Sequence, residues 1–157
     1  MFSTPASKTC LICYSGTFSD ALASFCQNCT SGRYLSDEGT DKLEHDTVDD
    51  CLTCSAGTYS GPGAKSCQIC ASGLYSNSPS STCKQCGSGR YLSDNGQDRE
   101  EHDDSSDCEV CAAGRYSAVA AAFCKSCEKG KYIDDNGKLS IHFSFSFFAN
   151  NKLIFLI

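Results

Sequence analysis

A short phrase built on two cysteines recurs seven times in this chain and constrains its fold more than any other feature. The phrase is Cys-x-x-Cys, two residues, Gly, one residue, and then Tyr or Phe, and all fourteen cysteines belong to it. An internal repeat this strict predicts an array of similar small units rather than one globular domain. The doublets are Cys10/Cys13, Cys26/Cys29, Cys51/Cys54, Cys67/Cys70, Cys83/Cys86, Cys108/Cys111 and Cys124/Cys127.

The segment from Cys10 to Cys127 has too few large apolar residues for an ordinary core. It holds fifteen Leu, Ile, Val and Phe among many Ser, Gly, Asp and Ala. So little apolar surface does not offset the conformational entropy lost when the whole segment becomes ordered. Cysteine makes up about one residue in eight here, which is typical of disulfide scaffolds. Closing a loop of about fourteen residues stabilises by about 3 kcal/mol in the chain-entropy treatment, so we expect covalent loops to supply the missing stability.

Two periods are superimposed in the spacing of the doublets. Successive doublets lie 16, 25, 16, 16, 25 and 16 residues apart, and the whole pattern repeats after 57 residues. The repeat indicates duplication of a three-loop cassette, in which we expect each loop to contact only its neighbours. The predicted divisions are a lead (1–9), two cassettes (10–66 and 67–127), the start of a truncated repeat (128–138) and an apolar tail (139–157).

The same phrase predicts the local structure of each loop. Its glycine suits a turn with positive φ, its ring can lie over a disulfide, and the residues around the ring can form a very short strand. No stretch has a 3.6-residue apolar period long enough for a helix, and the alanine-rich 118–122 is expected to be a turn. The predicted fold class is therefore a small disulfide-rich repeat array of short β-strands and loops, extended as a rod, with little or no helix.

The phrase, extended by a serine after most of its rings, resembles the cysteine-rich repeat of ephrin type A/B receptors. That repeat also occurs in tandem arrays of large protist surface proteins. The stretch from Cys13 to Cys26 is similar to the first loop of tumour necrosis factor receptor modules as well. The resemblance covers Cys10 to about Gly137, and it implies the module rather than one function, since such repeats serve as stalks, spacers and binding surfaces.

The receptor loop implies a head-to-tail disulfide pairing in which each doublet ends one loop and begins the next. Cys10 and Cys127 then remain unpaired in this chain. An interlaced pairing, Cys10–Cys26 with Cys13–Cys29, stays open as an alternative, because sequence alone does not fix connectivity. The implied bonds are Cys13–Cys26, Cys29–Cys51, Cys54–Cys67, Cys70–Cys83, Cys86–Cys108 and Cys111–Cys124.

Zinc is the main alternative use of the cysteines, because two Cys-x-x-Cys pairs can form a four-thiolate site. An odd number of doublets, each followed by the same glycine and ring, favours a uniform chain of loops instead. Redox catalysis through Cys-x-x-Cys requires a βαβ frame, for which the sequence shows no pattern.

Two long acidic loops repeat in detail, and they contain the candidate calcium ligands. Carboxylates recur there in Asp-x-Gly-x-Asp order, and such hard oxygen ligands suit calcium, although the full EF-hand pattern is absent. The weak calcium candidates are Asp37, Asp41, Asp94 and Asp98. We expect mainly solvated acidic loops, with His45 and His102 as surface histidines whose recurrence reflects the duplication.

The two ends differ from the repeats. Residues 1–9 are polar and lack the apolar region of a signal peptide, so we expect a fragment whose signal was lost with upstream sequence. Cys127 opens a repeat whose closing cysteine should fall near position 140 or 149, where Ser140 and Ala149 stand instead. We interpret the apolar 139–157 as translated non-coding sequence, with a partial membrane span or an unusual genuine tail as alternatives.

Together these patterns predict an extracellular or cell-surface stalk, adhesion or ligand-contact module of a larger protein. No catalytic order of Ser, His and Asp and no phosphate loop is present, so we expect neither an enzyme nor a cofactor. The expected partner is an extracellular protein or glycan, and membrane attachment would lie in other parts of the parent protein. A balance of 13 Lys and Arg against 19 Asp and Glu argues against nucleic acid. The alternative function is an intracellular interaction module that binds zinc through four cysteines.

Overall fold

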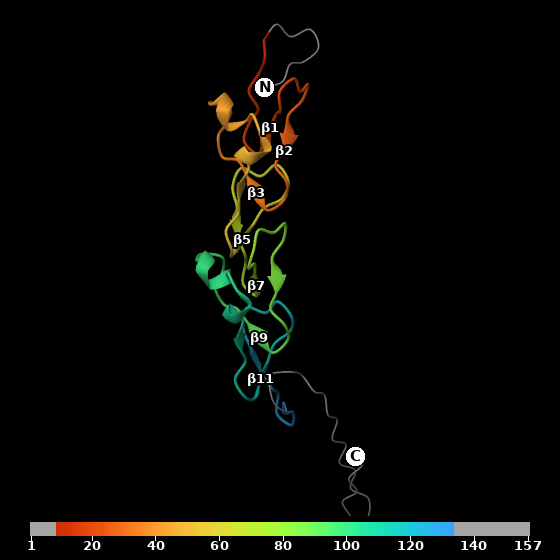
Figure 1. Ribbon diagram of the computed structural model, residues 1–157. Coiled ribbons are helices and arrows are strands. Elements are labelled where there is room, and N and C mark those ends of the chain that lie inside the picture. Colours follow the sequence, from red (N-terminus) through yellow and green to blue (C-terminus); the bar gives the residue numbers. More distant parts are fainter. Residues whose placement is uncertain (1–8, 134–157) are drawn as a thin grey trace, which may run out of the picture.

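The computed structural model describes residues 9–133, and these form a long, narrow rod of successive loops (Figure 1). Six antiparallel hairpins follow one another along it, each with strands of two residues. Within residues 9–133 there is no α-helix, and no helix there is long and apolar enough to cross a membrane. The predicted fold class is therefore confirmed, while the expectations for 1–8 and 139–157 lie outside the described residues.

The two residues that separate the cysteines of a doublet have a structural role. In every doublet after the first, the two residues between the cysteines form a strand, which pairs with the strand that carries the ring of the preceding phrase, as Gln27 does with Phe18. The ring strand was predicted, whereas the strand inside the doublet was not. The hairpins are β1 (Thr17–Phe18) with β2 (Gln27–Asn28), β3 (Arg33–Tyr34) with β4 (Leu52–Thr53), β5 (Thr58–Tyr59) with β6 (Gln68–Ile69), β7 (Leu74–Tyr75) with β8 (Lys84–Gln85), β9 (Arg90–Tyr91) with β10 (Glu109–Val110), and β11 (Arg115–Tyr116) with β12 (Lys125–Ser126).

The glycine of the phrase makes the turn into each hairpin. All seven of these glycines have positive φ, between +74° and +83°, which costs a residue with a Cβ atom more than it costs glycine. The same residue holds the loop closed through its backbone. The amide of Cys29 donates to the carbonyl of Gly16 at 2.8 Å, and five further loops repeat this bond at 2.9–3.0 Å.

Six disulfides close the loops head to tail. They join Cys13 to Cys26, Cys29 to Cys51, Cys54 to Cys67, Cys70 to Cys83, Cys86 to Cys108 and Cys111 to Cys124. The Cα atoms of each pair lie 5.6–5.9 Å apart, a usual separation for a disulfide. These pairs are the ones that the receptor-like loop implies. The interlaced pairing is absent, since Cys10 forms no disulfide here and Cys13 bonds to Cys26.

Each long loop contains two short 3₁₀ helices, and polar side chains cap their N-termini: an Asp at three of them and Thr47 at the fourth. The first loop contains η1 (Lys42–Glu44) and η2 (Val48–Asp50), and the second contains η3 (Arg99–His102) and η4 (Ser105–Asp107). An Asp side chain caps η1, where Asp41 accepts from the amide of Leu43 at 2.9 Å. The alanine-rich 118–122 is a turn, as expected, with Ala120 at a φ of 57°.

The buried apolar side chains form only small clusters around the disulfides. In one cluster, Phe18 and Leu35 pack with Cys29 and Cys51. In the other, Leu92 packs with Cys86 and Cys108, and Tyr75 packs against them. In both clusters the ring of one loop therefore lies against the disulfide of the next loop, so the thin core also links successive units.

Backbone hydrogen bonds link successive loops in a regular series. The carbonyl of Leu35 accepts from the amide of Gly16 at 2.8 Å, and its own amide donates to the carbonyl of Ala64 at 3.1 Å. The residue that follows the ring plays the same double role in the next three loops, at Ser60, Ser76 and Leu92. We call this series the backbone ladder. It joins neighbouring units without requiring particular side chains.

The loops also reach beyond their immediate neighbours, contrary to what the repeat pattern predicts. A Cβ atom on Gly16 would lie 2.1 Å from the carbonyl oxygen of Gly63, which belongs to the next loop but one. Gly57 and Gly73 lie equally close to backbone of the next loop but one, at Arg99 and Ala120. Loops this short overlap along the rod, so the expectation of nearest-neighbour contacts alone was wrong.

Candidate functional site

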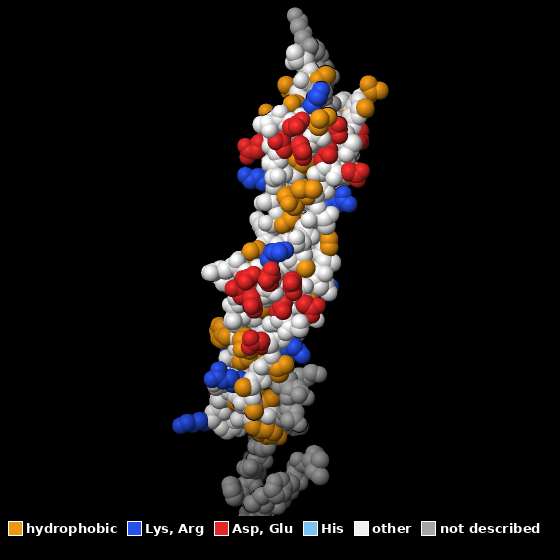
Figure 2. Space-filling view, turned by 60° about the vertical axis from the view of Figure 1, so that its left-hand side comes forward, with side chains coloured by type: hydrophobic (Ala, Val, Ile, Leu, Met, Phe, Trp, Pro, Cys, Tyr) orange, Lys and Arg blue, Asp and Glu red, His pale blue; other side chains and the backbone are white. Residues whose placement is uncertain are grey.

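The two long loops concentrate the negative charge of the molecule. Fourteen of the nineteen acidic residues lie between Asp37 and Asp50 or between Asp94 and Asp107. In the space-filling view the two loops form two separate acidic clusters on one side of the rod (Figure 2). An open hollow of about 430 Å³ lies at the first cluster, lined in part by Asp37, Asp41 and Glu44. These loops are the parts of the described chain in which polar side chains are most closely organised.

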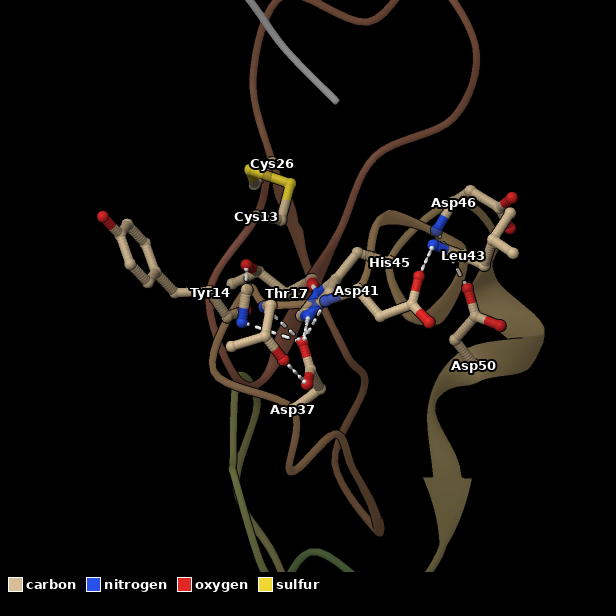
Figure 3. Close-up of polar contacts among 12 residues, drawn as sticks. Cys13, Tyr14, Thr17, Cys26, Asp37, Asp41, Leu43, His45, Asp46 and Asp50 are labelled. Carbon is tan, nitrogen blue, oxygen red and sulfur yellow. Dashed lines mark hydrogen bonds and ion pairs between the residues drawn. A yellow bond between two sulfur atoms is a disulfide. The ribbon is translucent and has the colours of Figure 1, made fainter. Parts of the chain in front are cut away.

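Asp37 organises the first acidic loop by accepting hydrogen bonds from the turn that follows it. Its Oδ2 accepts from the amides of Gly39 at 2.9 Å and Thr40 at 2.8 Å, and its Oδ1 accepts from the Thr40 hydroxyl at 2.6 Å (Figure 3). The Thr40 hydroxyl foremost, followed by the His45 side chain and the amides of Thr40 and Asp41, holds the pKa of Asp37 well below its ordinary value. The carboxylate is therefore kept ionised by its own loop.

Asp94 has the equivalent role in the second acidic loop. Its Oδ2 accepts from the amide of Gln97 at 2.9 Å and from the amide of Asp98 at 3.3 Å. The Gln97 amide and then the His102 side chain lower the pKa of Asp94. The duplication has thus preserved an ionised aspartate at the start of each long loop.

His45 is buried, contrary to the expectation of a surface histidine. Only 1% of it is exposed, and both of its ring nitrogens have oxygen partners. Nε2 lies 2.9 Å from Oδ2 of Asp37, and Nδ1 lies 2.7 Å from the carbonyl oxygen of Thr17 in the preceding loop (Figure 3). The ring fills space between two loops that have few apolar side chains to offer, and its polar atoms remain satisfied there.

His102 repeats this arrangement in the second cassette. It is 0% exposed, with Nε2 at 2.9 Å from Oδ2 of Asp94 and Nδ1 at 2.6 Å from the carbonyl oxygen of Leu74. The prediction of a surface position was therefore wrong for both residues. The available signal was an aspartate eight residues before each histidine, in a chain with little else to bury.

The backbone of each histidine contacts the same neighbouring loop as its ring. The carbonyl of His45 accepts from the amide of Ser19 at 2.9 Å, while the ring bonds to Thr17, so the two contacts flank Phe18. In the second cassette the carbonyl of His102 accepts from the amide of Ser76 at 2.8 Å. We call each set a histidine latch. The first latch is Asp37, His45, Thr17 and Ser19, and the second is Asp94, His102, Leu74 and Ser76.

The four calcium candidates have structural partners in these loops. Asp37 and Asp94 accept from their own turns, while Asp41 and Asp98 cap η1 and η3. Among residues 9–133, no group of three or more His, Cys, Asp or Glu side chains is arranged to hold a metal ion. Calcium binding by these four residues stays a sequence prediction.

The cysteines form an oxidised, disulfide-rich module. Twelve of the fourteen are consumed by the six bonds, so the structure does not support the four-thiolate zinc sites of the alternative function. The free thiols are Cys10, which is exposed, and Cys127, which is partly buried. Intramolecular disulfides in such number indicate an oxidising environment.

Comparison with known proteins adds no family to this picture. No family model matches the sequence, and no curated protein matches it significantly.

Proposed function

We propose that this chain is a stiff spacer segment of an extracellular or cell-surface protein, which holds other parts of that protein at a set distance. The observation that carries the proposal is the combination of head-to-tail disulfides with the backbone ladder. The proposal assigns no reaction to the chain. It retains the resemblance to the ephrin receptor-type repeat as the family hypothesis, with an extracellular protein or glycan as the partner class.

The disulfide pattern supports a spacer because it shortens the path that a pulling force takes through the chain. Between Cys13 and Cys51, for example, the force crosses one disulfide, the short strand β2 and then the next disulfide. The residues inside each loop are bypassed, so they add no length when the rod is stretched. Loops tied in this way resist extension even if their hydrogen bonds break.

Single-molecule stretching of the chain between two handles tests the proposal. With the disulfides intact we expect little extension beyond the folded length. Reduction should then release about 40 Å for a loop with a cysteine separation of 13 and about 70 Å for one of 22, from about 3.5 Å per extended residue. Large extension of the oxidised chain at low force would contradict the spacer.

A further inference from the structure

We infer that His45 and His102 are held as imidazolium cations, and that each long loop stays latched to the loop before it only in that form. The inference rests on the histidine latch and is independent of the proposed spacer role. It makes two joints of the rod, those between each long loop and the loop before it, responsive to pH.

The hydrogen-bond partners of each buried ring are all acceptors. At His45, Nδ1 faces the carbonyl oxygen of Thr17 and Nε2 faces a carboxylate oxygen of Asp37. A backbone carbonyl can only accept, and an ionised carboxylate can only accept. Both bonds therefore exist together only if both ring nitrogens carry hydrogen, which is the cationic state of histidine. The same is true of His102 with Leu74 and Asp94.

A neutral ring cannot satisfy both partners. If Nδ1 keeps its hydrogen, the lone pair of Nε2 faces an ionised oxygen 2.9 Å away in the Asp37 carboxylate. If Nε2 keeps its hydrogen, the lone pair of Nδ1 faces the carbonyl oxygen of Thr17 instead. In a site that is 1% exposed, no water can replace the lost bond without opening the loop.

The charges around each ring favour the cation. In the first cassette Asp37 is the charged group bonded to the ring, and the depressed pKa of this aspartate keeps it ionised. The long loop that carries His45 also contains Arg33, Glu38, Asp41, Lys42, Glu44, Asp46, Asp49 and Asp50, and the loop before it contains Asp20. The long loop that carries His102 also contains Arg90, Asp98, Arg99, Glu100, Glu101, Asp103, Asp104 and Asp107, and the loop before it contains no charged residue. Acidic groups outnumber basic ones in both sets, so a positive ring lowers the local repulsion.

The latch has a definite direction of response. Its stability is present while the ring is protonated and its aspartate is ionised. It is lost as pH rises and the ring loses its proton. Because the ring and the backbone carbonyl of His45 flank Phe18, loss of the ring bond loosens the contact that positions the whole long loop.

Nitrogen-15 spectra of the histidine rings test the protonation state directly, since the ring shifts distinguish the cation from either neutral tautomer. At pH 7 a free histidine side chain is largely neutral, because its ordinary pKa is about 6.5. We expect the rings of His45 and His102 to give imidazolium shifts at pH 7 in the oxidised protein. A spectrum of the neutral form for either buried ring would overturn the inference. An H142Q variant removes the signal of the third histidine.

The duplication supplies a matched control within one molecule. In Asp37→Asn the carboxylate becomes an amide that can donate to Nε2, so His45 should become neutral at pH 7 while His102 stays cationic. Asp94→Asn should produce the reverse pattern. If Asp37→Asn leaves the His45 shifts unchanged in the folded protein, the carboxylate does not hold the proton and the inference fails.

Hydrogen exchange tests the release of the loop. The amides of Ser19 and Ser76 donate to the histidine carbonyls, whereas the amide of Ser60 donates to Ser80 at a joint without histidine. As pH rises until the rings lose their protons, the protection factors at Ser19 and Ser76 should fall by about tenfold or more, the loss expected for a charge-assisted hydrogen bond. Protection at Ser60 should stay constant. Equal changes at all three amides would show that the latch is not the responsive element.

Discussion

Nδ1 of His45 lies 2.7 Å from the carbonyl oxygen of Thr17, a residue 28 positions earlier in the chain. The equivalent contact of His102 with Leu74 has the same separation of 28 residues. These contacts tie each long loop to the short loop before it by a side chain as well as by the backbone ladder. The three-loop cassette therefore includes a specific joint, in addition to its disulfides.

Acid should weaken both latches. Because the pKa values of Asp37 and Asp94 are lowered in the fold, their ionised forms stabilise it. That contribution is present above the ordinary Asp pKa of about 3.9 and is lost as pH falls through the depressed values. Urea unfolding of the oxidised protein at a series of pH values should show stability falling below about pH 4. The double variant Asp37→Asn, Asp94→Asn should show a flatter profile, and an unchanged profile would contradict this assignment.

Removing a latch ring should destabilise the fold far more than removing an exposed side chain. His45→Ala leaves a cavity, a carbonyl at Thr17 without its ring partner and a carboxylate without its counterion, so we expect a loss of about 2 kcal/mol or more. Leu43→Ala, at a side chain 64% exposed in the same loop, is the control and should cost less than about 0.5 kcal/mol. Urea unfolding with the disulfides intact measures both. Similar losses for the two variants would contradict the burial of the ring.

Three glycines separate the effect of backbone strain from that of close packing. Gly57 has a φ of +79° and would place a Cβ atom 2.0 Å from the carbonyl oxygen of Arg99, whereas Gly114 has a φ of +77° and no described atom within 4 Å. Gly87 has neither constraint. We expect Gly57→Ala to be the most destabilising, Gly114→Ala to cost about 1–2 kcal/mol through strain alone, and Gly87→Ala to be close to neutral. Thermal unfolding ranks them, and equal costs at Gly57 and Gly114 would argue against contacts between alternate loops.

The redox environment should decide whether the chain folds at all. Because its apolar clusters are small, the reduced chain should lack stable structure. When the chain is fused to a secretion signal and exported from a cell, the secreted protein should contain the six disulfides. Circular dichroism and amide dispersion before and after reduction provide the measurement. A reduced chain that keeps native dispersion without added metal would show that the loops do not depend on their disulfides.

The sequence predicted the features that repeat with the cysteine phrase. The positive φ of the glycines and the strands at the rings followed from residue types within a few positions of each other. The strand inside each doublet was missed because residues such as Gln27 and Asn28 have no strong strand preference, and their pairing comes from the disulfide that precedes them. The backbone ladder was also missed. It is made of amide and carbonyl groups that every residue except proline has, so no residue type marks its positions.

The buried histidines were missed because their partners are distant or not specific to sequence. Thr17 contributes only a backbone carbonyl to His45, and no side-chain pattern marks such an acceptor. The acidic surroundings of the histidine indicated a solvated loop, although the same charges stabilise a buried cation. Only the paired recurrence of Asp37 with His45 and of Asp94 with His102 pointed to the latch, and duplication alone explained that recurrence equally well.

Disulfide mapping tests the central claim, that the fold is a head-to-tail chain of loops, most directly. The oxidised protein would be digested without reduction after its free thiols are blocked, and the linked peptides identified by mass spectrometry. We predict six bonds, Cys13–Cys26 through Cys111–Cys124, with Cys10 and Cys127 recovered as blocked thiols. Peptides that link Cys10 to Cys26 and Cys13 to Cys29, or fourteen free thiols with bound zinc, would contradict the account.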